Sequence, residues 1–164
     1  MKGAVTCRST ERVAYGVPVA FELGTDGPSR ILVGVDGTET SMRAAAYAAG
    51  LARRQGARLV VLYVANSTGV ASGLAATAGA MVQTHDEIAD DLERQAAEEG
   101  PRIGIHVEFV RRRGNPYAEI VRTADEIRAD AIVVGASTQA GHRLVGSLAG
   151  RLVKDARWPV TVVP

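Results

Sequence analysis

The stretch Arg30-Ile-Leu-Val-Gly-Val-Asp-Gly-Thr38 decides the fold, because a strand signal and a turn signal meet within it. The apolar run from Ile31 to Val35 is typical of a strand that is buried on both faces of a sheet. The residues Asp36-Gly37-Thr38 that follow it favour a turn. A helix is predicted from Ser41 to Gln55, since small apolar residues recur on one face and Gly56 ends the pattern.

The same alternation of strand and helix continues to the end of the chain. Further strands are predicted at residues 59–64, 103–110, 131–134 and 160–163, and the alternating pattern of the segment 103–110 favours an edge strand. Helices are predicted at residues 84–99, where Gly100-Pro101 ends the pattern, from Asn115-Pro116 to Ile127, and at 147–156. The Gly- and Ala-rich stretch 66–81 is predicted to be a mobile loop. Strands separated by helices pair in parallel through right-handed crossovers. We therefore predict an α/β fold with a doubly wound, five-stranded, mainly parallel sheet and helices on both faces.

The pattern of apolar and polar residues changes near residue 30 and divides the chain into two parts. Residues 1–29 lack a clear period and are predicted to form an N-terminal extension, with one short strand at Val17–Leu23. The turn-rich residues 24–29 precede the start of the alternation. Residues 30–164 are predicted to form the single folded domain.

Composition excludes several classes of protein. The 164 residues include 19 basic and 18 acidic ones. This near-neutral balance of charge argues against a nucleic-acid module or a polybasic membrane anchor. The single cysteine, Cys7, cannot form an internal disulfide, and the scattered histidines show no metal-ligand spacing. No apolar run has the length of a signal sequence or a membrane span. We expect a cytoplasmic protein without nucleic-acid or membrane partners.

One glycine-rich segment is the main candidate for binding a ligand. Residues Gly135-Ala-Ser-Thr-Gln-Ala-Gly-His-Arg-Leu-Val-Gly-Ser147 follow a predicted strand and open a predicted helix. Glycines let the backbone approach a phosphate, and a helix start offers unpaired N–H groups. Arg143 adds positive charge, and Ser147 can donate to a phosphate or cap the helix. The segment is neither a Walker loop nor a dinucleotide fingerprint, so phosphate binding and plain turn formation both stay open.

Asp36 lies where the first strand meets its loop. In a doubly wound sheet, ligands bind beyond the carboxyl ends of the strands, where the strand order reverses. A carboxylate there can accept hydrogen bonds from an adenine amino group or a ribose hydroxyl. It can equally satisfy N–H groups at the start of the next helix, and both roles stay open. The run Arg111-Arg112-Arg113 is interpreted as a solvated strand end, with attraction of a polyphosphate or an acidic partner as the alternative.

Six segments, taken together in their order and spacing, resemble one known family. They are Ile31-Leu-Val-Gly-Val-Asp36-Gly-Thr-Glu-Thr-Ser41, Leu59-Val-Val-Leu-Tyr-Val64, Gly114-Asn-Pro116, Ala129-Asp130-Ala-Ile-Val-Val-Gly135, Gly146-Ser147 and Trp158-Pro159-Val-Thr-Val-Val163. Over residues 30–164 the chain resembles the universal stress protein family. The resemblance implies a flavodoxin-like sheet of order 3-2-1-4-5 and a homodimer joined through the C-terminal strand, residues 158–164. In one branch of the family it also implies ATP in the crevice between strands 1 and 4.

The resemblance also implies a set of nucleotide-binding residues. The adenine and ribose are expected near Gly34, Asp36, Val64 and Val134, and the phosphates near Gly135, Gly146, Ser147 and the Leu148 N–H. Val35, Thr138, Gly141 and Arg143 complete the predicted set. Thr138 stands where the ATP-binding branch has glycine, and ten residues separate Gly135 from Gly146 where that branch has twelve. Gly141 restores flexibility to this shorter loop.

Two functions follow as expectations. The first is a homodimeric stress-response module that binds ATP or another adenine nucleotide, with or without Mg²⁺. The alternative is a nucleotide-free interaction or chaperone-like dimer of the same fold, which the shortened loop and Thr138 support. No set of nucleophile, base and orienting group is evident in the sequence, so we expect neither catalytic residues nor an enzyme.

Overall fold

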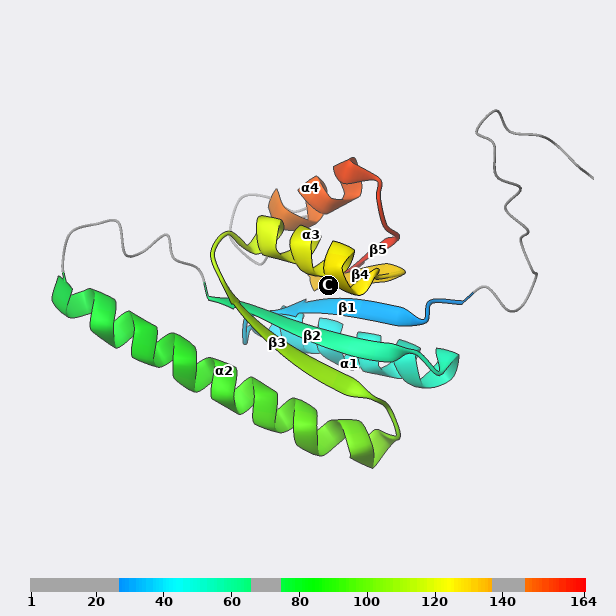
Figure 1. Cartoon of the computed structure of the whole chain (residues 1–164), viewed down its shortest axis with the longest axis horizontal. Coiled ribbons are helices and arrows are strands. Elements are labelled where there is room, and N and C mark those ends of the chain that lie inside the picture. Colours follow the sequence, from blue (N-terminus) through cyan, green and yellow to red (C-terminus); the bar gives the residue numbers. More distant parts are fainter. Residues whose placement is uncertain (1–26, 66–74, 137–146) are drawn as a thin grey trace, which may run out of the picture.

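The structure, a computed structural model, describes residues 27–65, 75–136 and 147–164, and gives the backbone alone for 75–84 and Ser147. Its strands and helices alternate along the whole described chain (Figure 1). The order is β1 (Arg30–Val35), α1 (Glu39–Gln55), β2 (Arg58–Ala65), α2 (Ala75–Ile103), β3 (Val107–Arg113), α3 (Pro116–Ile127), β4 (Ala131–Gly135), α4 (Ser147–Asp155) and β5 (Val160–Val163). The predicted strand Val17–Leu23 lies outside the described residues.

All five strands run parallel in one sheet of order β3-β2-β1-β4-β5. The predicted fold class and strand order are therefore confirmed. β1 lies in the middle of the sheet, with Val33 opposite Val61 of β2 on one side and Val133 of β4 on the other. β3 and β5 form the two edges, as the alternating pattern predicted for the third strand.

Two apolar cores fill the space between the sheet and its helices. α1 and α2 cover one face, where Ile31 and Val33 pack against the alanines of α1. α3 and α4 cover the other face, where Leu32 packs with Ile120 and Leu152. Neighbouring residues of β1 thus belong to opposite cores, which explains its unbroken apolar run.

The ends of α1 and α3 follow from local sequence. Thr38 caps α1 and its side chain accepts a hydrogen bond from the Ser41 N–H, while Gly56 ends the helix in the left-handed conformation. The helix begins at Glu39 rather than at the predicted Ser41. Asn115 caps α3 and Pro116 occupies its first turn, as predicted.

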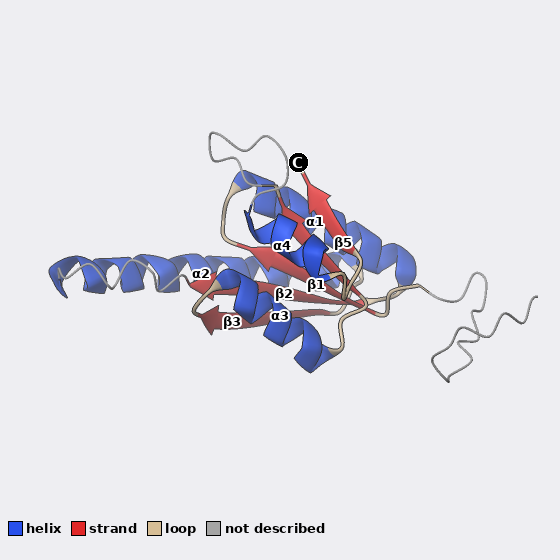
Figure 2. Cartoon of the chain, turned by 90° about the horizontal axis from the view of Figure 1, so that it is seen from above, coloured by secondary structure: helices blue, strands red, loops and turns tan. Residues whose placement is uncertain are grey.

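The prediction for the region around α2 is wrong in two places. The helix begins at Ala75, so residues 75–81 are helical where a mobile loop was predicted; residues 66–74 of that loop lie outside the described residues. At its other end the helix passes through Pro101 and ends at Ile103. With 29 residues the helix is about 43 Å long, and Figure 2 shows its first turns reaching past the carboxyl ends of the strands.

The third strand is also shifted from its prediction. It spans Val107–Arg113 rather than 103–110, because Ile103 belongs to the last turn of α2 and pairing with β2 sets Val107 opposite Leu59. The close approach of that last turn requires Gly100. A Cβ there would lie 2.8 Å from a methyl group of Val107.

The end of β4 packs tightly on the start of α1. A Cβ at Gly135 would lie 2.7 Å from the carbonyl carbon of Thr40 and 2.8 Å from the Ser41 nitrogen, both backbone atoms. Backbone cannot move aside as a flexible side chain can, so only glycine fits. Gly34 differs, because a Cβ there would meet side-chain atoms of Ile120 and Val134 at 3.4 Å or more.

Trp158, just before β5, packs against the core under α3 and α4, and the Arg157 guanidinium lies 4.3 Å from the centre of its ring. Within the described chain, every helix lacks the combination of length and apolar character that crossing a membrane requires.

We predict that Gly135→Ala destabilises the protein by about 1–3 kcal/mol, the usual cost of forcing a methyl group into a filled space. Gly34→Ala is the matched control and should change the free energy of unfolding by less than about 1 kcal/mol. Urea unfolding of both variants measures the difference. Equal stability of the two variants would contradict the close packing at Gly135.

Candidate functional site

The carboxyl ends of β1 and β4 lie side by side in the sheet, and the helices that follow these two strands pack on opposite faces of it. α1 follows β1 onto one face of the sheet, whereas α4 follows β4 onto the other. Such a switch point leaves a crevice between the two departing chains, and doubly wound folds bind ligands there. We therefore take this edge of the sheet as the candidate site.

Six of the predicted site residues meet at this edge. They are Gly34, Val35 and Asp36 from the end of β1, Val64 from β2, and Val134 and Gly135 from β4. Val35 and Val134 are buried in opposite cores, Gly34 lies against Val134, and Asp36 is exposed.

The predicted phosphate segment is described only at its ends. The Ala136 N–H donates to the Val163 carbonyl at 2.7 Å, which carries the sheet pairing one residue past β4. Ser147 is the first residue of α4, and Leu148 packs at the edge of the core. Thr138, Gly141, Arg143 and Gly146 lie outside the described residues.

Asp36 organises the turn between β1 and α1. Its Oδ1 accepts hydrogen bonds from the Thr38 N–H at 3.0 Å and from the Thr38 hydroxyl at 2.6 Å. Its own N–H donates to the Ser41 hydroxyl at 3.3 Å, and that hydroxyl donates to the Thr38 carbonyl at 2.9 Å. The role at the helix start, one of the two open interpretations, is therefore present. Within the described part of the chain, Oδ2 receives no hydrogen bond and can still accept one from a ligand.

These contacts keep Asp36 ionised. Burial acts to raise the pKa of Asp36, but the hydrogen bonds that the carboxylate receives from Thr38, together with the nearby Ser41 hydroxyl, outweigh it, and the net effect is a pKa below the ordinary value of 3.8. A carboxylate fixed in this way is a constant negative acceptor at neutral pH.

A second polar pair lies next to Asp36 on the α1 face. The Tyr63 hydroxyl, at the end of β2, is 2.8 Å from His85 Nδ1 of α2. Burial raises the pKa of Tyr63, and the negative charges of Asp36 and Asp86 raise it further. Tyr63 therefore stays protonated at neutral pH. The sequence interpretation did not connect His85 with this edge, although it precedes Ile88 by three residues and so shares its helical face.

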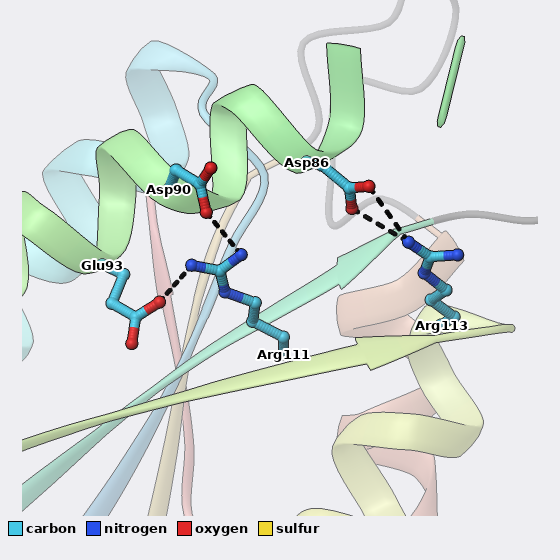
Figure 3. A network of polar contacts seen from close by, with 5 residues as sticks. All are labelled: Asp86, Asp90, Glu93, Arg111 and Arg113. Atoms are coloured by element: carbon cyan, nitrogen blue, oxygen red, sulfur yellow. Dashed lines mark hydrogen bonds and ion pairs between the residues drawn. The ribbon is translucent and has the colours of Figure 1, made fainter. Parts of the chain in front are cut away.

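The three arginines of β3 are paired with carboxylates of the same chain. Arg111 lies between Asp90, at 2.6 Å, and Glu93, while Arg113 holds Asp86 at 2.9 Å (Figure 3). On the opposite side of the sheet, Arg112 is 2.8 Å from Glu126 of α3. Partly exposed pairs of this kind contribute at most about 1 kcal/mol each. The pairs of Arg111 and Arg113 nevertheless hold α2 against the edge strand β3. Because carboxylates already neutralise these arginines, their attraction for a polyphosphate is weaker than the sequence alone suggested.

Metal binding gains no support from the described side chains. Across residues 27–65, 85–136 and 148–164, no three His, Cys, Asp or Glu side chains come together as a ligand set.

We predict that Asp36 stabilises the fold in a pH-dependent way. A carboxylate with a depressed pKa in the folded state stabilises fully above its unfolded pKa, about 3.9, and loses that contribution as the pH falls through the folded value. Urea unfolding of wild type and Asp36→Asn should therefore show a difference at pH 6 that shrinks steadily below about pH 4. A difference that stays constant down to pH 2.5 would contradict the assignment.

Comparison with known proteins identifies the family. The sequence matches the universal stress protein family over residues 28–164. It is 31% identical to universal stress protein MJ0531 of Methanocaldococcus jannaschii over 142 residues, which cover 82% of this chain and 81% of that protein.

Solved structures show the same fold. Universal stress protein UspA from Lactobacillus plantarum superposes with a TM-score of 0.68 at 26% identity, covering 83% of this chain and 97% of that one. A universal stress protein family protein from Arabidopsis thaliana, solved with AMP bound, superposes with a TM-score of 0.61 at 20% identity and covers 83% of this chain and 91% of that one. The flavodoxin-like sheet, its Asp36 turn and these matches lead to one conclusion: the chain belongs to the universal stress protein family.

Proposed function

We propose that the chain is a homodimeric regulatory module of the stress response that binds an adenine nucleotide between β1 and β4. The observation that carries this proposal is Oδ2 of Asp36 at the switch point, which receives no hydrogen bond from the described residues; Gly135 of β4 packs close by on the start of α1. Ser41 links the two residues, because its hydroxyl accepts from the Asp36 N–H and its nitrogen lies against Gly135. A carboxylate acceptor at this edge of the sheet suits a ribose hydroxyl or an adenine amino group.

ATP is the first ligand to test, with or without Mg²⁺. The AMP bound to the Arabidopsis protein of this fold supports the adenine class. The segment between Gly135 and Ser147, with Gly141, Gly146 and Arg143, would hold the phosphates. We propose binding rather than catalysis because Oδ1 of Asp36 is fixed by Thr38, as befits an acceptor rather than a proton carrier.

The nucleotide-free alternative rests on Thr138 and the short loop. If Thr138 must adopt the left-handed conformation of the glycine it replaces, that conformation costs roughly 1–2 kcal/mol. A chain without nucleotide would then act through its surface alone.

We predict that a saturating adenine nucleotide stabilises the chain. At a hundred times its dissociation constant a ligand should add about 2.7 kcal/mol, which a thermal shift with ATP, ADP, AMP and cAMP, each with and without Mg²⁺, will register. Asp36→Ala should weaken binding at least tenfold, because a hydrogen bond to a charged group contributes about 1.5–3 kcal/mol. Asp91→Ala, on the outer side of α2, is the control and should bind as wild type does. No shift with any nucleotide favours the nucleotide-free dimer.

The dimer is proposed to form through the free edge of β5. The carbonyls of Pro159 and Val163 accept from Ile132 and Ala136, so they point toward β4. Because backbone groups alternate along a strand, the N–H and C=O groups of Val160 and Val162 point away from the sheet. An apolar edge with unpaired groups is a template for a second copy.

We predict that Val162→Pro gives a monomer with an intact fold. Proline removes the outward N–H of β5 and leaves the pairing with β4 in place. Val162→Ala, which keeps that N–H, should remain dimeric. Sedimentation equilibrium reports the mass, and circular dichroism checks the fold. A Val162→Pro dimer would exclude this edge as the interface.

A further inference from the structure

An apolar groove runs between α1 and α2 over the sheet. Its volume is about 480 Å³, within the range of small-molecule sites. Ala45 and Ala49 of α1 and Ala96 of α2 form its walls, and Leu59 and Val61 of β2 form its floor. α1 lies mainly over β1 and β4 and α2 mainly over β3, and the groove runs between the two helices above Leu59 and Val61 of β2, which are themselves buried.

A basic hollow adjoins this groove at the amino ends of the strands. It has a volume of about 390 Å³, and Arg30, Arg53, Arg58 and His106 line it. The two cavities share Arg53 and Ile105 in their linings, so an elongated molecule can occupy both.

Two arginines at this junction, Arg30 and Arg53, have no carboxylate partner among the ion pairs of the described residues. Glu99, which also lines the groove, is held by Arg102 at 2.6 Å, and the Arg58 guanidinium is 3.9 Å from Glu108. The Arg30 guanidinium donates to the Ile127 carbonyl at 2.9 Å. Among the ion pairs of the described residues, Arg53 has no carboxylate partner. The junction therefore combines an apolar channel with an uncompensated positive charge at its mouth.

We propose that this composite cavity binds an anionic amphiphile with a single acyl chain, a free fatty acid. The alkyl chain lies in the groove between the two helices, and the carboxylate pairs with Arg53 in the basic hollow. Charge complementarity at one end and an apolar wall along the rest select this class over a nucleotide or an uncharged lipid. The basic hollow lies at the opposite end of the strands from Asp36, although Val35 also lines the groove, and the proposal does not depend on nucleotide binding.

Isothermal titration of the full chain with octanoate, decanoate and dodecanoate, each below its micelle concentration, tests the proposal. Affinity should rise up to about fourfold for each added CH₂, the factor that full burial of a methylene gives. Dodecanol, which lacks the charge, should bind at least tenfold more weakly than dodecanoate. Absence of binding, as when a second copy or another part of the chain fills the groove, overturns the proposal.

Two neighbouring arginines supply matched variants. Arg53→Glu should weaken dodecanoate binding at least tenfold, whereas Arg54→Glu makes the same charge change in the last turn of α1, outside both cavities, and should bind within twofold of wild type. Ala49→Leu should shorten the channel and abolish the gain from decanoate to dodecanoate. Urea unfolding confirms that each variant is folded. Equal loss in both arginine variants, or an unchanged chain-length series in Ala49→Leu, would mean non-specific surfactant binding and overturn the proposal.

Discussion

β1 has a hydrogen-bonded neighbour on each side, and the rest of the molecule depends on this position. A strand inside a parallel sheet buries both faces, so its side chains need a core above and a core below. Ile31 and Val33 supply one core and Leu32 the other. Helices must then cover both sides, and the chain can cover both only by departing from β1 and from β4 in opposite directions. The crevice that holds Asp36 is a consequence of that divergence.

The sequence interpretation succeeds where one residue type dominates a segment. The apolar runs of β1, β2, β4 and β5 are all found as strands, and Asn115-Pro116 begins its helix as expected. The strand order came from the family resemblance, because periodicity alone does not order strands. Thr38 could have been identified as the cap of α1, since an Asp two residues before it is a turn signal.

The interpretation fails around α2 for a physical reason. Alanine- and glycine-rich residues such as 75–80 fit a loop or a helix equally well, because alanine has the best helix propensity and no side chain to mark a buried face. At the other end, Gly100-Pro101 is a typical stop signal. Here Gly100 serves close packing on Val107 instead, and the helix runs on to Ile103. The following strand, β3, therefore begins later in the sequence than predicted.

The two interpretations of Asp36 turn out to be compatible. One carboxylate oxygen fixes the helix start, the other receives no hydrogen bond from the described residues, and the lowered pKa keeps the group ionised. Similarly, the arginine run has a structural role, since Arg111 and Arg113 pair with Asp86, Asp90 and Glu93 and so hold α2 against the edge strand. Sequence shows which residues are charged, but the partners across the sheet edge emerge only when the strands are paired.

Trp158 gives the molecule a built-in optical reporter. It is the chain's single tryptophan, it packs against the core under α3 and α4, and the Arg157 guanidinium lies over its ring. Fluorescence excited at the red edge of indole absorption therefore comes from one place, the junction of α4 and β5. Quenching and emission wavelength will follow rearrangements at that junction without any label, while the groove between α1 and α2, on the opposite face of the sheet, stays spectroscopically silent.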